Sequence, residues 1–401
     1  MQQCPIDKVV IFLIATPMRS NFADVLLDDI HGGLNAARAT SYIIRMSDAN
    51  EINDVWQFIQ ERSKGYDYVI GIDLNGNFNS PPMIEFERWR RFTILIDHPY
   101  CHAYKFAKYK PDLACSVIDR THEHALKDVD INFTTKFLPH AGPPPEENVP
   151  PIPKRERDIL FCGNVSNIIL PGQLGEHIHR FPQPIQHITL KAIEQVISGE
   201  CDIHSALKLA ISDVLSDTIS AVPLKTLSVI CKTIETYVAG RMRLELLIKL
   251  LAEKDLKIDV VGRLREPLEA HGIEIKENGA IRFHNHLPFN IVTDMMSASK
   301  IVLNSNFISQ AGSHERIWHG IARGCAIITN ESSYLRDEFG KGEGINFIPK
   351  KQELLGPLLH QKLADLSRLD EIATAAKGHY VSRHTWRHRA KDLLKLLKIK
   401  M

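Results

Sequence analysis

The sequence lacks the features of a membrane or secreted protein. No apolar run reaches the roughly 18–20 residues that a membrane-spanning helix needs. The apolar stretch near the start, 9–16, has eight residues and follows Asp7-Lys8 instead of a basic leader. The seven cysteines are odd in number and scattered, without a Cys-x-x-Cys pair. These absences argue against a disulfide framework and predict reduced thiols in a cytoplasmic protein.

An excess of charge of one sign is also missing. The chain has 49 Lys and Arg against 48 Asp and Glu, a formal net charge of +1. A protein that binds DNA or RNA through bulk attraction usually shows a clear basic excess, so no nucleic-acid partner is predicted. A content of 44% hydrophobic and 24% charged residues excludes disordered and collagen-like chains. Because single cores stop growing near ~250–300 residues, 401 residues predict two domains.

Common cofactor and hydrolase motifs are absent or fail on spacing. No P-loop and no Gly-x-Ser-x-Gly occurs, and the loop after the first predicted strand lacks the glycines of a dinucleotide-binding turn. The run HERIWH (314–319) separates its histidines by five positions, about 140° around a helix. A zinc helix needs His at i and i+4. The glycines of GKGEG (340–344) precede a strand, not a helix. We therefore expect no cofactor.

Two further patterns of metal-binding residue types have simpler interpretations. The pairs His122/His124 and His284/His286 are chance pairs of the kind that 19 histidines produce, although on a strand each pair would share a face. The Asp-x-Asp at 128–130 precedes a predicted strand instead of following one, so we interpret it as a solvated turn. No metal site is predicted.

The first third of the chain alternates short β-rich runs with helical stretches. A first helix, capped by Ser20 or Asn21, ends near Gly32-Gly33, and a second spans about 50–63. Strands separated by helical crossovers predict a doubly wound parallel sheet. The strands are expected at 8–16, 41–46, 66–73, 92–99, 113–118 and 133–139.

A proline-rich stretch separates this series from a second one. Six prolines fall within the eleven residues 143–153, as expected for a semi-rigid spacer. Strands of the second series are expected at 157–164, 257–263, 280–287, 300–306 and 325–330, with a helical insertion over about 167–254. The fold class is therefore α/β, with two Rossmann-like doubly wound domains facing a cleft. The expected parts are an N-terminal domain (1–142), a linker (143–156), a C-terminal domain (157–382) and a basic C-terminal helix (383–401).

The C-terminal segment 383–401 has seven Lys or Arg, one Asp and a crowd of aliphatic residues. A helix packed on the protein with a solvated basic face is the favoured interpretation. The alternative is peripheral contact with the inner face of an anionic membrane, where lipid-linked acceptors are found.

The strongest constellation lies between Asn304 and Asn330. A strand ending at Asn304 leads into a loop, and a helix begins near Ser313 with Glu315 and Arg316 in its first turn. Loop amides and a helix N-terminus can bind a pyrophosphate without a metal. Arg316 can add a bidentate phosphate contact, and Glu315 can accept hydrogen bonds from sugar hydroxyls. The alternative is an ordinary crossover with a capped helix.

This stretch, together with GEGINFI (342–348), resembles the C-terminal domain of GT-B-fold glycosyltransferases. The closest group is the bacterial one often called spore-maturation-type, or glycosyl transferases group 1. Other segments resemble the same family: FLPHAGPPP (137–145), RERDILFCGNVSN (155–167), the run 241–263 and HTWRHRAKDLL (384–394). In the first domain only the order of strands and helices and ILIDHP (94–99) fit.

The resemblance implies a transferase that moves a sugar from a nucleotide-sugar to an acceptor, which is a glycan, a lipid-linked molecule or a protein. The donor would bind mainly the C-terminal domain and the acceptor the N-terminal one. By motif, the donor-binding residues would be Gly163, Asn164, Gly262, Arg263, Asn304, Ser313, His314, Glu315 and Arg316.

The chain departs from the family pattern in the helix after Ser313. Many members have Glu-Ala there, with the Glu holding donor hydroxyls, whereas this chain has His319-Gly320. His319 can still hydrogen-bond a hydroxyl or a phosphate, and its charge would change near neutral pH. The departure also favours a protein that binds a sugar or nucleotide without turning it over.

Catalysis by inversion needs a group that takes the acceptor proton, whereas a retaining enzyme would instead rely on phosphate stabilisation by Arg263 and Arg316. Asp97 and His98, at the carboxyl end of a predicted strand, are the best candidates, and Asp73 is the second. The alternative role of Asp97 is to cap the helix ahead of Pro99. Metal-independent glycosyl transfer is thus the leading function, with a nucleotide-sugar epimerase or a phosphorylase on the same fold, or a non-catalytic binding protein, as alternatives.

Overall fold

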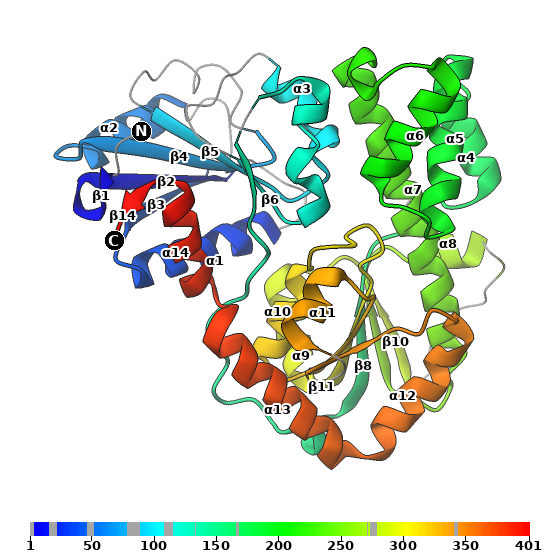
Figure 1. Cartoon of the computed structure of the whole chain (residues 1–401). Helices are drawn as coiled ribbons and strands as arrows, with labels where there is room; N and C mark the ends of the chain where they lie inside the picture. Colours follow the sequence, from blue (N-terminus) through cyan, green and yellow to red (C-terminus); the bar gives the residue numbers. More distant parts are fainter. Residues whose placement is uncertain are drawn as a thin grey trace. The chain divides into compact units, whose positions relative to one another are not determined.

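The computed structural model describes residues 4–15, 22–45, 52–77, 89–107, 115–132, 134–165, 168–270, 272, 279–340 and 344–401. They form two units, coloured along the chain in Figure 1. Unit 1 comprises Met1–Gly142, Ser220–Val229 and His384–Met401, and unit 2 comprises Pro143–Ile219 and Ile230–Arg383. Each unit is built around its own parallel sheet.

The sheet of unit 1 contains β2 (Val9–Ala15), β3 (Thr40–Arg45), β4 (Tyr68–Leu74), β5 (Trp89–Leu95), β6 (Cys115–Val117) and β7 (Thr135–Phe137). Their order is β3-β2-β4-β5-β6-β7, and all pairs are parallel. Every residue of β2 is buried. Ile11 and Leu13 pack with α1 (Phe22–Ala36), while Val10 and Phe12 face the other way toward α2 (Ile52–Arg62). Helices cover both faces, as a parallel sheet requires.

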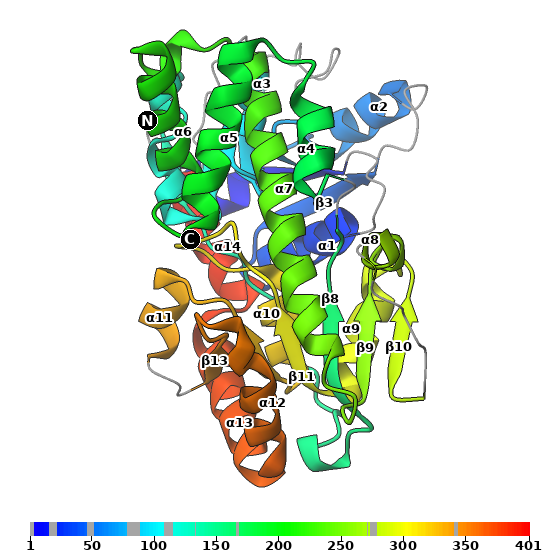
Figure 2. The same ribbon diagram turned by 90° about the vertical axis from the view of Figure 1, so that its right-hand side faces the viewer.

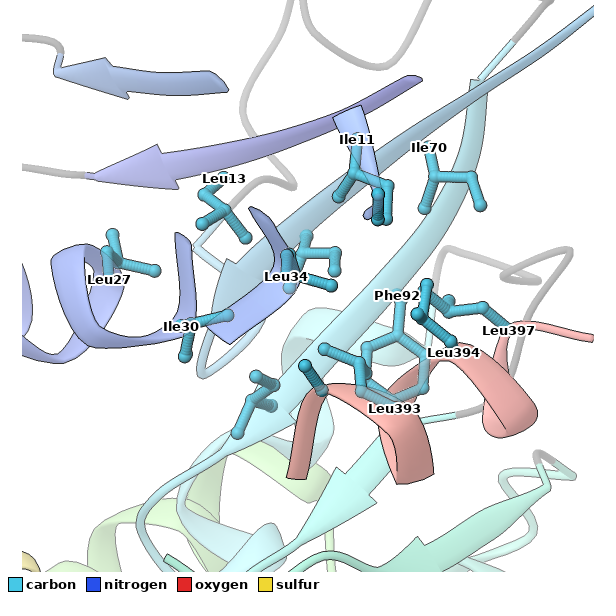
Figure 3. Close-up of a cluster of buried hydrophobic side chains, with 14 of the residues drawn as sticks. Ile11, Leu13, Leu27, Ile30, Leu34, Ile70, Phe92, Leu393, Leu394 and Leu397 are labelled. Carbon is cyan, nitrogen blue, oxygen red and sulfur yellow. The ribbon is translucent and has the colours of Figure 1, made fainter. Parts of the chain in front are cut away.

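The segment after residue 384 completes unit 1. It forms α14 (Trp386–Leu396) and a short strand, β14 (Ile399–Lys400), which pairs with β1 (Cys4–Pro5). Leu393, Leu394 and Leu397 are buried in the same core as α1 and β2 (Figure 3). The favoured interpretation of a packed helix is thus confirmed, except that the predicted helix ends at Leu396 and a strand follows. The leucine side of α14 is not available to a membrane.

The prediction that the first helix ends near Gly32-Gly33 is wrong, because α1 continues to Ala36. The physical reason is the packing of α14. A Cβ atom on Gly33 would lie 2.4 Å from the backbone oxygen of Trp386, so the glycine permits the two helices to touch. The predicted caps of α1, Ser20 and Asn21, lie outside the described residues.

The sheet of unit 2 contains β8 (Arg157–Cys162), β9 (Ile258–Val261), β10 (Ile281–His284), β11 (Ser299–Asn304), β12 (Ala326–Thr329) and β13 (Ile345–Phe347). Their order is β10-β9-β8-β11-β12-β13, again all parallel. Its helices include α8 (Arg265–Ala270), α9 (Phe289–Ala298), α10 (Glu315–Ala322), α11 (Ser333–Phe339), α12 (Leu355–Ala364) and α13 (Leu366–Arg383). The predicted fold class, two doubly wound parallel α/β sheets, is confirmed.

Between β8 and β9 the chain is helical, as predicted. This part contains α4 (Pro171–Ile178), α5 (Gln183–Ile197), α6 (Ile203–Leu215) and α7 (Leu224–Leu251), which Figure 2 shows side by side. Asp202 caps α6 by accepting from the Ser205 amide at 2.8 Å. The first turns of α7 belong to unit 1 and the rest to unit 2.

Short elements complete the chain: α3 (Ala103–Phe106) and the 3₁₀ turns η1 (Ile6–Lys8), η3 (Pro99–Cys101), η4 (Arg120–His124), η5 (Lys127–Val129), η6 (Ile152–Lys154), η7 (Ile219–Ala221) and η8 (Gln352–Leu354). Among the described helices, none combines the length and the apolar character that crossing a bilayer would require.

Candidate donor site and candidate base

Two loops meet at the carboxyl edge of the unit 2 sheet. The Gly163 amide donates to the oxygen of Val261 at 3.0 Å, and the Arg263 amide donates to Oδ1 of Asn164 at 3.1 Å. Gly262 has φ +134°, and a Cβ atom there would lie 1.9 Å from the oxygen of Gly163. Only glycine fits this contact. The predicted residues 163, 164, 262 and 263 are thus brought together by the loops after β8 and β9.

Arg243, on α7, joins this edge and was missed by the sequence analysis. Its Nε donates to Oγ of Ser305 at 3.0 Å and its Nη1 to the oxygen of Asn164 at 3.0 Å. A Cβ atom on Gly163 would lie 3.3 Å from Cδ of Arg243. Within the part of the chain that the structure describes, no acceptor faces its Nη2. The guanidinium is fixed by two contacts and keeps one N–H₂ group for a ligand.

The electrostatics of this edge favour an anion. Burial, and then the charge of Arg316, lower the pKa of Arg243 to about 10, while Glu315 opposes this shift. Arg263 is exposed at the same edge. The guanidinium groups of Arg243, Arg263 and Arg316 thus outnumber the carboxylate of Glu315 here. Clustered cations in a partly buried site attract negatively charged ligands.

Helix α10 starts two residues later than predicted, at Glu315, with His314 as its N-cap. Oγ of Ser313 accepts from the indole Nε1 of Trp318 at 3.0 Å, so the hydroxyl serves the packing of the helix. His314 Nδ1 lies 2.7 Å from Oε2 of Glu315. Arg316 donates from Nη1 to the oxygen of Cys162, at the end of β8. The first turn of α10 is therefore tied to β8, beside the two loops.

Asn304, the last residue of β11, is buried, with 1% of its surface exposed. Its Nδ2 donates to Oγ1 of Thr329 at 2.9 Å. Its Oδ1 has no hydrogen-bond partner among the residues that the structure describes. Its neighbour Ser305 is the acceptor for Arg243. Asn304 thus lies next to the serine that holds Arg243, and its Oδ1 accepts no hydrogen bond from the described residues.

His319 and Gly320 lie in the buried interior of α10. The His319 ring packs edge-on against Phe289 of α9, with 5.0 Å between ring centroids. A Cβ atom on Gly320 would come within 2.7 Å of Cδ1 of Ile327 on β12. The glycine therefore has a packing reason: the Cβ atom of an alanine would push the helix off its sheet.

In unit 1, Asp97 follows β5 and remains half exposed, at 49% of its side-chain surface. Its Oδ2 accepts from Nδ2 of Asn75 at 2.8 Å and from Nε2 of His102 at 3.0 Å. The second candidate, Asp73, is only 3% exposed within β4. Of the two carboxylates, Asp97 is the one that a substrate can reach.

His98 has a structural role in packing and capping. Its ring is 2% exposed and packs against His122, with 4.4 Å between centroids. Its Nδ1 accepts from the amide of Tyr100 at 3.2 Å, so His98 caps η3. The alternative role proposed for Asp97, a cap ahead of Pro99, belongs to His98 instead.

The histidine pairs at 122/124 and 284/286, for which no metal site was predicted, have structural explanations. His122 and His124 lie on the 3₁₀ turn η4, not on a strand. His284 donates to Asp259 at 3.0 Å, and Asp259 also pairs with the buried Arg157 at 2.7 Å. Positions 341–343 of the GKGEG loop lie outside the described residues.

Comparisons with known proteins agree with this architecture. Residues 241–395 match the model of the family described as glycosyl transferase-like. No curated protein matches the chain. Among solved structures, an alpha-glucosyltransferase in complex with UDP superposes with a TM-score of 0.58 at 8% identity, over 97% of this chain and 99% of that one. Sucrose-phosphate synthase from Thermosynechococcus elongatus gives 0.53 at 10% identity, over 97% and 98%.

At such identities the likeness shows the fold, which is GT-B. A glycosyltransferase from Rickettsia africae ESF-5 has the same fold, with a TM-score of 0.50 at 11% identity over 98% of each chain. The two parallel α/β sheets thus give the chain the GT-B fold, and the segment 241–395 is similar to the glycosyl transferase-like family. For this segment the resemblance to glycosyltransferases seen in the sequence is confirmed.

Proposed function

We propose that the protein transfers a sugar from a nucleotide-sugar to a hydroxyl acceptor without a metal ion, and that unit 2 binds the donor. The observation that supports this most is Arg243. Its guanidinium is fixed between the ends of β8 and β11, has one N–H₂ group open, and lies close enough to Arg316 for the two charges to interact. A diphosphate is the anion that such a charge-assisted pair of groups recognises well.

The donor diphosphate would lie against Arg243, Arg263 and the glycine loops at 163 and 262. Arg316 would add positive charge from behind, through its contact with the end of β8. When the glycosidic bond breaks, negative charge develops on the leaving diphosphate, and fixed guanidinium groups stabilise it as a divalent cation would. Glu315 would accept from a donor hydroxyl, whereas Asn304, with 1% of its surface exposed, would support the site from beneath.

For an inverting transfer, Asp97 would act as the general base, with His98 packed behind it in the cap of η3. The acceptor hydroxyl gives its proton to the carboxylate as its oxygen bonds to the sugar C1. The bond from C1 to the diphosphate oxygen breaks, and the electron pair leaves with the nucleoside diphosphate. The acceptor class would be a glycan, a lipid-linked molecule or a protein, and not a nucleic acid.

Titration of UDP, GDP and dTDP, free and as nucleotide-sugars, tests the donor site through the melting temperature and calorimetry. Loss of one charge-assisted hydrogen bond costs about 1.5–3 kcal/mol. Arg243→Gln should therefore weaken the preferred nucleotide at least ~10-fold. Arg241→Gln is the matched control, because Arg241 lies on the same helix and pairs with Glu245 at 2.7 Å. Its affinity should equal that of the unaltered protein.

Failure of all three nucleotides to bind would refute the donor site. Equal losses in Arg241→Gln and Arg243→Gln would show a general effect on α7. EDTA should leave turnover unchanged, and loss of turnover restored by Mn²⁺ would contradict metal independence. Release of nucleotide only with acceptor present excludes a binding protein, and a changed sugar without acceptor would indicate an epimerase.

A further inference from the structure

The carboxylate of Asp97 is held at one oxygen only. Its two donors, Nδ2 of Asn75 and Nε2 of His102, both reach Oδ2, at 2.8 and 3.0 Å. Within the described ranges, Oδ1 has no hydrogen-bond partner, and the side chain is half exposed. A carboxylate fixed in this way presents a single oxygen, in one orientation, to whatever approaches.

The amide of Asn75 is itself fixed by the ends of β4 and β5. Its Oδ1 accepts from the Ile96 amide at 2.9 Å, which directs Nδ2 toward Asp97. The backbone of Asn75 has φ +57°, and its backbone N–H donates to the oxygen of Ile94 at 2.9 Å. Lys105 donates to the oxygen of Asn75 at 2.9 Å. The residue thus lies in a rigid turn, and asparagine is among the few residues that adopt this backbone readily.

His102 approaches from the segment that joins η3 to α3. It is buried, with 6% of its side chain exposed, and its amide donates to the oxygen of Pro99 at 3.0 Å. An ionised carboxylate accepts hydrogen bonds but does not donate them. The contact therefore requires a proton on Nε2 of His102, which fixes the imidazole as a donor.

We infer that His102 and Asn75 are positioning residues that hold Asp97 so that Oδ1 receives the proton of the acceptor hydroxyl, an inference that rests on the proposed function. In the step, the acceptor O–H bond breaks, its proton bonds to Oδ1, and the oxygen bonds to the sugar C1. The bond from C1 to the diphosphate oxygen breaks at the same time, and its electron pair leaves with the nucleoside diphosphate. The two donors on Oδ2 prevent the carboxylate from rotating. Displacement of a reacting group by about 1 Å can cost ~10²-fold in rate.

The test compares His102→Phe, which removes the donor, with His102→Gln, whose amide can reach the same oxygen. The readout is UDP released from UDP-glucose, with water as acceptor. His102→Phe should lower kcat ~10- to 100-fold and leave KM for UDP-glucose unchanged. His102→Gln should stay within about 3-fold of the unaltered protein, because the hydrogen bond is restored. Thr93→Val serves as the control, since Thr93 supports the same turn through Gly76 at 2.9 Å.

Nitrogen-15 spectra of the imidazole give a readout that does not depend on turnover. The resonance assigned to His102 should show a proton on Nε2, and Asp97→Ala should shift it. Three outcomes would overturn the inference but not the proposed function. They are a kcat of His102→Phe equal to that of an active unaltered protein, an equal loss of kcat in both His102 variants, and an Nε2 without a proton. Absence of nucleotide release from the unaltered protein with UDP-, GDP- and dTDP-linked sugars, tested with water and with hydroxyl acceptors, would refute the proposed function and the inference with it, whatever the spectra show.

Discussion

Among single residues, Gly320 shows how a local packing need changes a family pattern. Its absent side chain lets α10 lie on β12, where Cδ1 of Ile327 would otherwise be 2.7 Å from a Cβ atom. His319 beside it is turned to Phe289 in the interior. The departure from Glu-Ala therefore comes with a close helix–sheet contact.

Gly320→Ala should destabilise unit 2 by about 1–3 kcal/mol, the usual cost of overpacking a core. The double variant Gly320→Ala with Ile327→Val removes the opposing Cδ1 methyl and should recover most of that loss. Urea unfolding followed by circular dichroism measures both. A double variant no more stable than the single one would show that the clash lies elsewhere.

Residue by residue, the sequence predicted part of the site. Asp97 was found because it follows a β-rich run, and strand ends gather at one edge of a parallel sheet. Arg243 was missed because its partners, Asn164 and Ser305, are 79 and 62 positions away, across the helical insertion. His102 was missed because no pattern links it to Asp97 before the 3₁₀ turn is known.

At the scale of elements, α14 shows how a segment far along the chain completes an early core. It packs against α1, and Leu393 and Leu394 are fully buried beside β2. Leu393→Ala should destabilise unit 1 by about 2–5 kcal/mol, because it leaves a cavity in a packed core.

The matched control for this prediction is Lys391→Ala, at an exposed position of the same helix. It should change the free energy of unfolding by no more than about 0.5 kcal/mol. Denaturant unfolding, with proteolysis to report unit 1 separately, measures the pair. Equal stabilities of the two variants would show that α14 adds little to the core.

Strands were the most predictable elements. Continuous apolar runs such as 8–16 are best buried between two helical layers, and eleven of the twelve strands of the two sheets lie at or next to predicted runs. For β13 no range was predicted, only a strand after the glycines of GKGEG. Helix ends were less predictable. The boundary of α1 depended on a distant helix, and the end of α14 depended on the pairing of β14 with β1.

For the molecule as a whole, buried thiols link stability to alkaline pH. Burial raises the pKa of Cys115 to about 11 and that of Cys162 to about 12. In the unfolded chain these thiols ionise near their ordinary value, so the unfolded state loses protons first. The stabilisation is therefore complete below about pH 8.5 and is lost as pH rises toward 11–12.

Each thiol should contribute a loss of about 1.4 kcal/mol per pH unit within that window. The measurement is the urea midpoint at several pH values between 8 and 11, for the unaltered protein and for Cys162→Ala. Other groups ionise in this range too, so the difference in slope between the two proteins isolates the thiol. Parallel slopes would contradict the assignment.

The return of the chain to unit 1 has a consequence for biosynthesis. The helix α14 and the strand β14 are translated only after all of unit 2 has been synthesised. Until then, the faces of β2 and α1 that α14 covers lack their partner. We therefore expect unit 1 to complete its folding after unit 2, the reverse of the usual order in which N-terminal domains fold first during synthesis. In the nascent chain, these early segments are the ones that a chaperone would protect.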